Sequence, residues 1–197
     1  MRLPNSWLLH TLHTSAHLGK ASLSRMYSGV STSRGHPGRI FCDLDGVLCD
    51  FDRGVVNIFG VPPEELSKKT MWGGLSRAPG FYSNLEWMND GRELWEGIRG
   101  LQPTILTGVP MGKWAEPQKR AWCSDELGGD VPVITCMSRD KHKYCHSPGC
   151  ILIDDRGSLR VDWESQGGLF IHHTSTRQSL KELEAILSPK PATVDLT

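Results

Sequence analysis

Two carboxylates two positions apart, Asp43 and Asp45, follow an apolar run in the stretch IFCDLDGVLCDF. A second acidic pair, Asp154 and Asp155, ends another short apolar run, ILIDD. Four carboxylates brought to one place would repel one another and raise each other's pKa unless a cation lay among them. Oxygen ligands with free positions for water suit Mg²⁺. The sequence therefore predicts a Mg²⁺ site, provided that the fold brings the two pairs together.

Two further groups have chemistry that suits a phosphate ester. Thr107 ends the apolar run TILT, and the loop SRDKHKYC carries Lys141 and Lys143. A hydroxyl and an ammonium group can bind phosphoryl oxygens and balance the charge that develops on them. The basic residues of the stretch MGKWAEPQKRAW, which are Lys113, Lys119 and Arg120, either attract an anionic substrate or belong to a solvated helix surface.

The elements that must position these groups follow from hydrophobic patterning. Five short, largely β-branched apolar runs predict parallel strands at residues 40–44, 104–106, 131–136, 151–153 and 169–172. Longer amphipathic stretches predict helices at residues 52–59, 90–99, 116–127, 158–165 and 177–187. This alternation favours an α/β fold with a doubly wound, Rossmann-like parallel sheet. Ligands of such sheets bind outside the carboxyl ends of the strands, where the two acidic pairs and Thr107 lie in the sequence.

One interval is too long for a simple crossover between strands. About 50 residues separate the first two predicted strands, and they include the aromatic-rich stretch MWGGLSRAPGFYSNLEW. We interpret residues 51–88 as a small helical cap, inserted after the first strand, that roofs the site. Its aromatic residues either stack on a nucleobase or form the core of the cap, and Trp72 and Phe81 are the best candidates for the pocket.

The motifs together resemble a known family. In order along the chain, DLDGV, an apolar strand ending in Thr107, a Lys-containing loop and ILIDD are similar to the four motifs of the haloacid dehalogenase superfamily. The segments GFYSNLEWMNDGRELWEGI, SRDK and ILIDDR resemble the 5′(3′)-deoxyribonucleotidase group within it. The resemblance extends over about residues 39–173. It implies the superfamily's α/β sheet and a phosphatase that acts through an aspartyl-phosphate.

The resemblance also implies a role for each motif residue. Asp43 is the nucleophile and Asp45 the general acid and base, while Thr107 and Lys141 bind the phosphoryl oxygens. Mg²⁺ is held by the carboxylates of Asp43, Asp154 and Asp155 and by the backbone carbonyl of Asp45. Superfamily dehalogenases and cation-pumping ATPases lack an acid at the position of Asp45, so this residue favours a phosphatase.

The chain also departs from the nucleotidase pattern. Thr107 is followed by Gly108, Val109 and Pro110, where nucleotidases usually have a Ser-containing turn, and Gly108 is a candidate substrate contact. An insertion, KHKYCHSPGC, leaves Lys143 as an alternative to Lys141. The His and Cys residues of segment 142–150 form either a zinc site or a flexible loop, and their spacing matches no established zinc motif.

The expected function is Mg²⁺-dependent hydrolysis of phosphomonoesters, with a nucleoside monophosphate as the favoured small-molecule substrate. One alternative keeps this chemistry for another small phosphate ester or a polynucleotide end. The other is a catalytically silent binding protein that retains the fold. With 22 basic and 22 acidic residues the formal net charge is zero, so a duplex nucleic-acid partner is not expected. A membrane partner is not expected either, and a homo-oligomer is compatible with the sequence.

The ends of the chain differ from the rest in composition. Residues 1–39 contain five basic residues and no acidic one, and they are rich in Ser, Thr and His. This composition predicts a mitochondrial targeting segment at residues 1–38, with plastid import or an untargeted cytoplasmic tail as alternatives. The hydrolase domain is expected at residues 39–190 and a tail at residues 191–197. The six scattered cysteines are expected to be reduced thiols.

Overall fold

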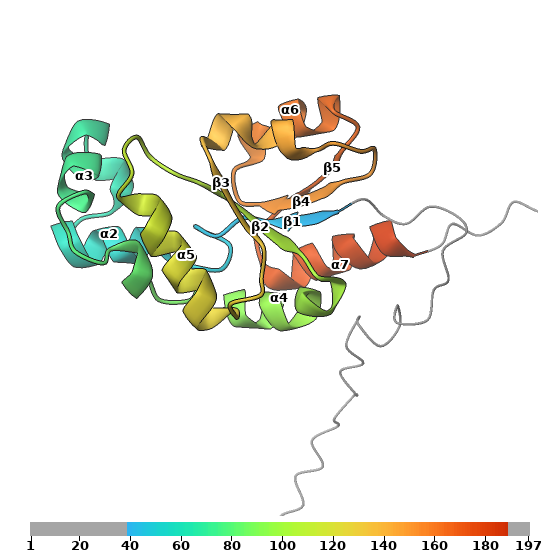
Figure 1. Cartoon of the computed structure of the whole chain (residues 1–197), viewed down its shortest axis with the longest axis horizontal. Coiled ribbons are helices and arrows are strands. Elements are labelled where there is room, and N and C mark those ends of the chain that lie inside the picture. The colour runs from blue at the N-terminus through green and yellow to red at the C-terminus, as the bar shows by residue number, and fades with distance from the viewer. Residues whose placement is uncertain (1–38, 189–197) are drawn as a thin grey trace, which may run out of the picture.

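The computed structural model describes residues 39–188. The predicted targeting segment, 1–38, and the predicted tail, 191–197, lie outside these residues. The described chain is an α/β fold whose five-stranded, all-parallel sheet has the order β3-β2-β1-β4-β5 (Figure 1). Its strands are β1 (Ile40–Cys42), β2 (Thr104–Gly108), β3 (Val133–Cys136), β4 (Ile151–Asp154) and β5 (Leu169–His172). All five predicted strands are therefore present.

Five of the six helices lie close to predicted positions. The six are α2 (Phe51–Phe59), α3 (Lys68–Leu75), α4 (Gly91–Ile98), α5 (Ala115–Glu126), α6 (Arg160–Ser165) and α7 (Thr176–Leu187). Of these, α3 lies in the segment interpreted as a cap, where no helix bounds were predicted. Ser175 caps α7, because its side chain accepts a hydrogen bond from the backbone N–H of Gln178. The predicted helix at 158–165 is divided into the 3₁₀ turn η5 (Gly157–Leu159) and α6. The start of β3 was predicted two residues too early, because Val131 bonds back to Gly128 in a turn.

The central strands β1, β2 and β4 bury both of their faces, as their apolar composition requires, while β3 and β5 at the sheet edges are partly exposed. One core contains Ile40, Cys42 and Ile153 of the sheet together with residues of α4, α5 and α7. The other contains Phe41 and Leu152, which point to the opposite face and pack with Trp163 of α6. Alternate residues of a strand point to opposite faces, so each short strand supplies both cores. Helices accordingly cover both sides of the sheet (Figure 1).

The strand register aligns the ends that carry the predicted site. Cys42 of β1 pairs with Ile105 of β2 on one side and with Ile153 of β4 on the other. The backbone N–H of Asp43 continues this pairing by donating to the carbonyl of Ile153 over 2.9 Å. The carboxyl ends of three neighbouring strands therefore meet at one edge of the sheet.

The long interval between β1 and β2 begins with two helices that lie beyond this edge. The α2 and α3 helices are separated by the 3₁₀ turn η1 (Pro63–Glu65), and the turn η2 (Tyr82–Asn84) precedes α4. In Figure 1 α2 and α3 lie together at the left, on the side toward which β1 points. Asp50 caps α2 by accepting from the N–H of Arg53, and Ser67 caps α3 by accepting from that of Thr70. No helix among residues 39–188 has the length and apolar composition needed to span a bilayer.

Candidate active site

Three of the four predicted carboxylates form one cluster at the strand ends. Asp43 follows β1 and Asp154 ends the neighbouring strand β4, with Asp155 next to it. Each of the three offers a carboxylate oxygen within 4.8 Å of the others. The side chains of Asp43 and Asp154 are buried. The fold thus brings Asp43 together with the Asp154–Asp155 pair at the edge where the sequence places them.

Lys141 is the cation at the centre of this cluster. Its ammonium lies 2.8 Å from Oδ2 of Asp43 and 2.6 Å from Oδ2 of Asp154, and its side chain is 1% exposed. Burial disfavours the charged form of Lys141, but the two carboxylates outweigh burial and raise its pKa. Lys143 instead pairs with Asp140 over 2.9 Å at the surface, where its side chain is 64% exposed. Of the two candidate lysines, only Lys141 enters the cluster.

A second buried lysine, Lys119, holds Asp45. Its ammonium lies 2.5 Å from Oδ2 of Asp45 and donates to Oγ1 of Thr107 over 2.9 Å. The same ammonium lies 4.4 Å from the centre of the Tyr82 ring, in a cation–π contact. Burial raises the pKa of Asp45, and Lys119 opposes that shift only in part. Lys119 therefore connects the predicted acid–base residue to the predicted phosphate-binding hydroxyl.

Sequence reasoning did not assign Lys119 to the site. It was grouped with Lys113 and Arg120, which are exposed, whereas Lys119 is fully buried. Helical spacing offered a usable signal, because Lys119 is four residues after Ala115 and three before Trp122, and both are buried. A lysine in the middle of an apolar helix face needs an internal partner, and here the partner is Asp45.

The oxygen atoms left without partners favour a divalent cation. Oδ1 of Asp43 and Oδ1 of Asp155 are buried and accept no hydrogen bond from residues 39–188. Burial and the neighbouring Asp43 raise the pKa of Asp154 to about 6 and that of Asp155 to about 7. Clustered carboxylates with unsatisfied oxygens fit a hard cation such as Mg²⁺, which prefers oxygen ligands. The donor set therefore suits the metal predicted from the sequence.

The two acids of the ILIDD motif are not equivalent. Oδ1 of Asp154 accepts from the backbone N–H of Arg156 over 2.9 Å, and its Oδ2 is occupied by Lys141. Asp155 keeps a buried oxygen without a partner. The backbone at Gly46 can lie close to the Asp155 carboxylate because glycine has no Cβ, which would clash with that carboxylate. The φ of Gly46, +74°, is also unfavourable for other residues. Asp43 and Asp155 are thus the side chains best placed as direct ligands.

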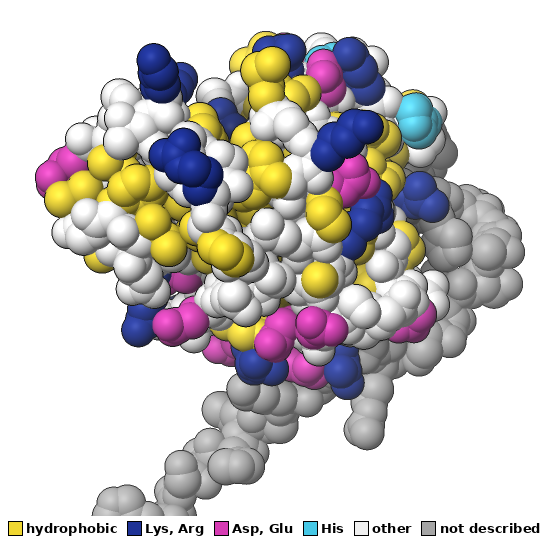
Figure 2. Space-filling model, turned by 60° about the vertical axis from the view of Figure 1, so that its left-hand side comes forward, with side chains coloured by type: hydrophobic (Ala, Val, Ile, Leu, Met, Phe, Trp, Pro, Cys, Tyr) yellow, Lys and Arg dark blue, Asp and Glu magenta, His cyan; other side chains and the backbone are white. Residues whose placement is uncertain are grey.

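The cluster opens into a large cleft of about 1100 Å³. One wall is aromatic and includes Phe51, Trp72, Tyr82 and Trp114, with Phe51 and Tyr82 stacked 6.2 Å apart. Figure 2 views the molecule from the side of α2 and α3 and shows apolar side chains interspersed with Lys and Arg. The basic residues that line the cleft are Lys68, Lys69, Arg139 and Arg156. The cleft therefore combines an acidic floor, an aromatic wall and a basic rim.

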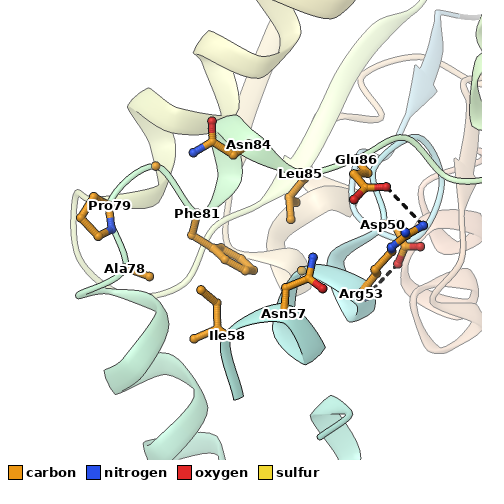
Figure 3. A pocket seen from close by; sticks show the side chains of 12 residues that line it. Asp50, Arg53, Asn57, Ile58, Ala78, Pro79, Phe81, Asn84, Leu85 and Glu86 are labelled. Carbon is orange, nitrogen blue, oxygen red and sulfur yellow. Dashed lines mark hydrogen bonds and ion pairs between the residues drawn. The ribbon is translucent and has the colours of Figure 1, made fainter. Parts of the chain in front are cut away.

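The predicted substrate contacts separate into two groups. Trp72 and Gly108 line the cleft, but Phe81 does not. Phe81 is buried against Phe51 and Tyr82, with ring centres 5.6 and 4.9 Å away, and faces a smaller pocket of about 170 Å³ (Figure 3). That pocket contains none of the clustered carboxylates, and its charged residues include the ion pair of Arg53 and Glu86. Phe81 supports the aromatic wall from behind.

The segment with His and Cys residues has a more regular structure than expected. Residues 142–144 of the predicted loop 142–150 belong to the 3₁₀ helix η4 (Ser138–Tyr144), whereas residues 145–150 form no helix or strand. Cys145 and Cys150 are buried free thiols of the second core. Among residues 39–188, the one cluster of potential metal ligands is formed by aspartates, so the zinc alternative has no support in that part of the chain.

The assembled groups can act on a phosphate ester. Asp43 has a carboxylate oxygen without a partner, which has the chemistry of a nucleophile, and the Asp45 carboxyl two residues later could carry a proton. Two buried lysines supply positive charge. No protein-family model matches the chain, and no curated protein sequence matches it significantly. Function is therefore inferred from the geometry of these residues.

Proposed function

We propose that the protein is a Mg²⁺-dependent phosphomonoester hydrolase of the haloacid dehalogenase type. The observation that carries this proposal is the convergence of Asp43, Asp154 and Asp155 around Lys141 at one edge of the sheet. Asp45 and Lys119 lie beside this cluster, which places a proton carrier next to the nucleophile. A structural ion-pair network alone would not leave carboxylate oxygens buried without partners.

The reaction takes place in two displacements. Asp43 attacks phosphorus, so a bond forms between its oxygen and phosphorus while the bond to the leaving alkoxide breaks. Asp45 gives its proton to that alkoxide. Water then attacks the aspartyl-phosphate, Asp45 takes a proton from this water, and inorganic phosphate and free Asp43 result. Burial raises the pKa of Asp45 while Lys119 opposes the shift, so the group is closer to taking up a proton than an ordinary aspartate.

The metal would be held by the carboxylates of Asp43 and Asp155 and by the backbone carbonyl of Asp45. When bound, Mg²⁺ offsets the negative charge of the carboxylates and the phosphoryl oxygens. Asp154, whose oxygens are engaged by Lys141 and by the N–H of Arg156, orients Lys141 toward Asp43. Lys141 binds the phosphoryl group, as the motif resemblance implies. The Thr107 hydroxyl is buried and accepts from Lys119, so Thr107 positions that lysine beside Asp45.

The favoured substrate is a nucleoside monophosphate. Residues 51–88 act as a cap whose side chains Phe51, Trp72 and Tyr82 form an aromatic wall above the carboxylates. Any nucleobase offers a π-face on which such rings can stack. The phosphate of a mononucleotide would reach the strand ends while its base contacts this wall.

A polynucleotide end is a second candidate substrate, and the basic rim favours it. Lys68, Lys69, Arg139 and Arg156 form no ion pair with other residues between 39 and 188, although all four line the cleft. Such cations could contact phosphates beyond the one that is hydrolysed. The cleft volume of about 1100 Å³ also exceeds what a drug-sized ligand requires. A catalytically silent binding protein is disfavoured, because it would not need Asp45 and its buried lysine.

A phosphate-release screen tests the proposal. Purified protein with Mg²⁺ is incubated with nucleoside monophosphates, sugar phosphates and 5′- or 3′-phosphorylated oligonucleotides. We expect turnover of at least one nucleotide, loss of it on addition of a chelator, and a phosphorylated enzyme after acid quenching of labelled substrate. Asp43→Asn should abolish both signals, while Asp162→Asn, an exposed acid on α6, should abolish neither.

Two results would contradict the proposal. Turnover that survives in Asp43→Asn would exclude this residue as the nucleophile. Folded protein that hydrolyses none of the esters but still binds one of them would favour the silent binding protein instead.

A further inference from the structure

Gly108 and Ser138 fit together across two neighbouring strands. Gly108 ends β2, where it pairs with Cys136 of β3, and Ser138 follows β3 two residues later. A Cβ on Gly108 would clash with Oγ of Ser138 and lie 3.3 Å from its Cβ. Gly108 is not among the residues with positive φ, so its backbone does not itself require glycine. The missing side chain of Gly108 therefore makes room for the Ser138 hydroxyl.

The Ser138 hydroxyl lies close to the groups that would hold phosphate. Ser138 and Lys141 are the first and fourth residues of η4, and side chains three apart in a 3₁₀ helix lie on the same side. Lys141 in turn contacts Asp43, the proposed nucleophile. Ser138, Gly108 and Asp43 all line the same cleft.

The hydroxyl of Ser138 is also free to act. Its side chain makes no hydrogen bond with the rest of residues 39–188, whereas Thr107 is completely buried and already accepts a bond from Lys119. Ser138 is half-buried and reaches the cleft. Of these two hydroxyls, the one open to an entering ligand is that of Ser138.

We propose that the Ser138 hydroxyl donates a hydrogen bond to a non-bridging oxygen of the bound phosphoryl group, in the space that Gly108 leaves open. This inference rests on the proposed function and adds a contact at the same site. A hydrogen bond to a charged acceptor is stronger than one between neutral groups, so its loss has a measurable effect on affinity.

Moving the hydroxyl between the two positions tests the proposal. Ser138→Ala should weaken inhibition by inorganic phosphate and lower kcat/KM by about tenfold or more.

Gly108→Ser alone should also impair activity, because the new serine side chain would clash with Ser138. The double variant Gly108→Ser/Ser138→Gly returns a hydroxyl to nearly the same place and should recover most of both losses. Ser165→Ala, which removes a serine hydroxyl from α6, is the control and should match the wild type.

Calorimetric titration of each variant with inorganic phosphate and Mg²⁺ separates the outcomes. If the wild type hydrolyses esters but Ser138→Ala matches it within twofold in kcat/KM and phosphate affinity, the Ser138 contact is wrong and the proposed function stands. If Ser138→Ala instead loses activity but binds phosphate as tightly as the wild type, with no recovery in the double variant, the contact is overturned. Ser138 then has a structural role. If no ester is hydrolysed, the proposed function fails, and the phosphate affinities of the two proteins decide the Ser138 contact. Weaker phosphate binding by Ser138→Ala than by the wild type supports the contact. Equal affinities, or no phosphate binding by the wild type, overturn it.

Discussion

At the scale of single residues, the ammonium of Lys119 contacts three groups at once: Asp45, Thr107 and the face of Tyr82. Each contact keeps a charge or a hydroxyl in place inside the protein. A buried ion pair contributes little net stability when complete, but removing one partner leaves the other charge buried and unpaired. The effect of replacing Lys119 should therefore greatly exceed that of replacing a surface lysine.

We expect Lys119→Met to lower the free energy of unfolding by about 1–3 kcal/mol, because the Asp45 carboxylate that loses its partner is partly exposed to the cleft. The same change should reduce kcat by at least about a hundredfold. Urea unfolding and phosphate release measure the two effects. Lys113→Met, an exposed neighbour, should change the free energy of unfolding by less than about 0.5 kcal/mol. Asp45→Asn combined with Lys119→Met should be less destabilised than Lys119→Met alone, because no buried charge is then left unpaired. Equal destabilisation of the single and double variants would contradict this account of the pair.

Residue types predicted much of the acidic cluster but not all of its partners. Asp43, Asp154 and Asp155 could be placed together because each follows a recognisable strand. Lys119 could not be distinguished from its exposed neighbours by charge, since its burial depends on how α5 packs on the sheet. Residue type alone makes Phe81 a candidate for the substrate pocket. Tertiary packing decides which aromatic side chains face the cleft, and Phe81 does not face it.

At the scale of elements, the short apolar strands were predictable because a parallel strand with helices on both faces needs no polar residue. The exact ends of the strands were harder to predict. For example, β3 starts only after Pro132, because proline has no N–H to donate to the sheet. The helices of the 51–88 segment are short and are held by local caps such as Ser67. Their arrangement over the strand ends follows from aromatic packing between distant residues, including the contact of Tyr82 with Trp114.

The α3 helix brings Trp72 to the cleft, which leads to a prediction about substrate choice. We expect Trp72→Ala to raise KM for a nucleoside 5′-monophosphate by about tenfold, because stacking of a base on an aromatic ring contributes about 1–3 kcal/mol. Ribose 5-phosphate, which has no base, should be hydrolysed with unchanged kcat/KM. Steady-state kinetics on both substrates make the comparison. A similar loss on both would mean that Trp72 supports the fold of the cap and does not contact the base.

At the scale of the whole molecule, the acidic cluster connects stability to pH and to metal. The folded protein holds the pKa of Asp154 at about 6 and that of Asp155 at about 7, both above the ordinary value of 3.8. The metal-free folded state therefore binds more protons than the unfolded state between about pH 4 and pH 7. Stability must then fall as pH rises through this window. Mg²⁺ held by these carboxylates, as we propose, would remove the cause by offsetting the repulsion between them.

We expect the melting temperature of the metal-free wild type to fall between pH 5.5 and pH 8. The melting temperature of Asp155→Asn should fall less over the same range, because this variant lacks one of the titrating acids. Mg²⁺ should raise the melting temperature of the wild type more at pH 8 than at pH 5.5. Differential scanning fluorimetry with ionic strength matched by KCl measures both differences. A Mg²⁺ effect that is independent of pH, or equal in Asp155→Asn, would argue against metal binding at this cluster.

The contrast in charge between the two parts of the chain leads to a prediction about maturation. Residues 1–39 carry five basic and no acidic residues, whereas residues 40–197 carry 17 basic and 22 acidic ones. We propose that residues 1–38 direct the protein to mitochondria and are then removed. Mass spectrometry of the protein isolated from fractionated cells should find its first residue close to Arg39. A chain that still begins at Met1, or that begins beyond Ile40, would contradict this proposal.

The long excursion between β1 and β2 also bears on how such a protein can change over evolution. The two strands that flank it pair directly, Cys42 with Ile105, so the sheet fixes where the excursion leaves and where it returns. Doubling the length of a flexible connection costs only about 0.6 kcal/mol in loop-closure entropy. A different set of helices spliced between Asp50 and Gly91 would therefore meet an unaltered sheet edge. If the proposed function holds, such a change could alter substrate preference while the acidic cluster at the strand ends stays the same.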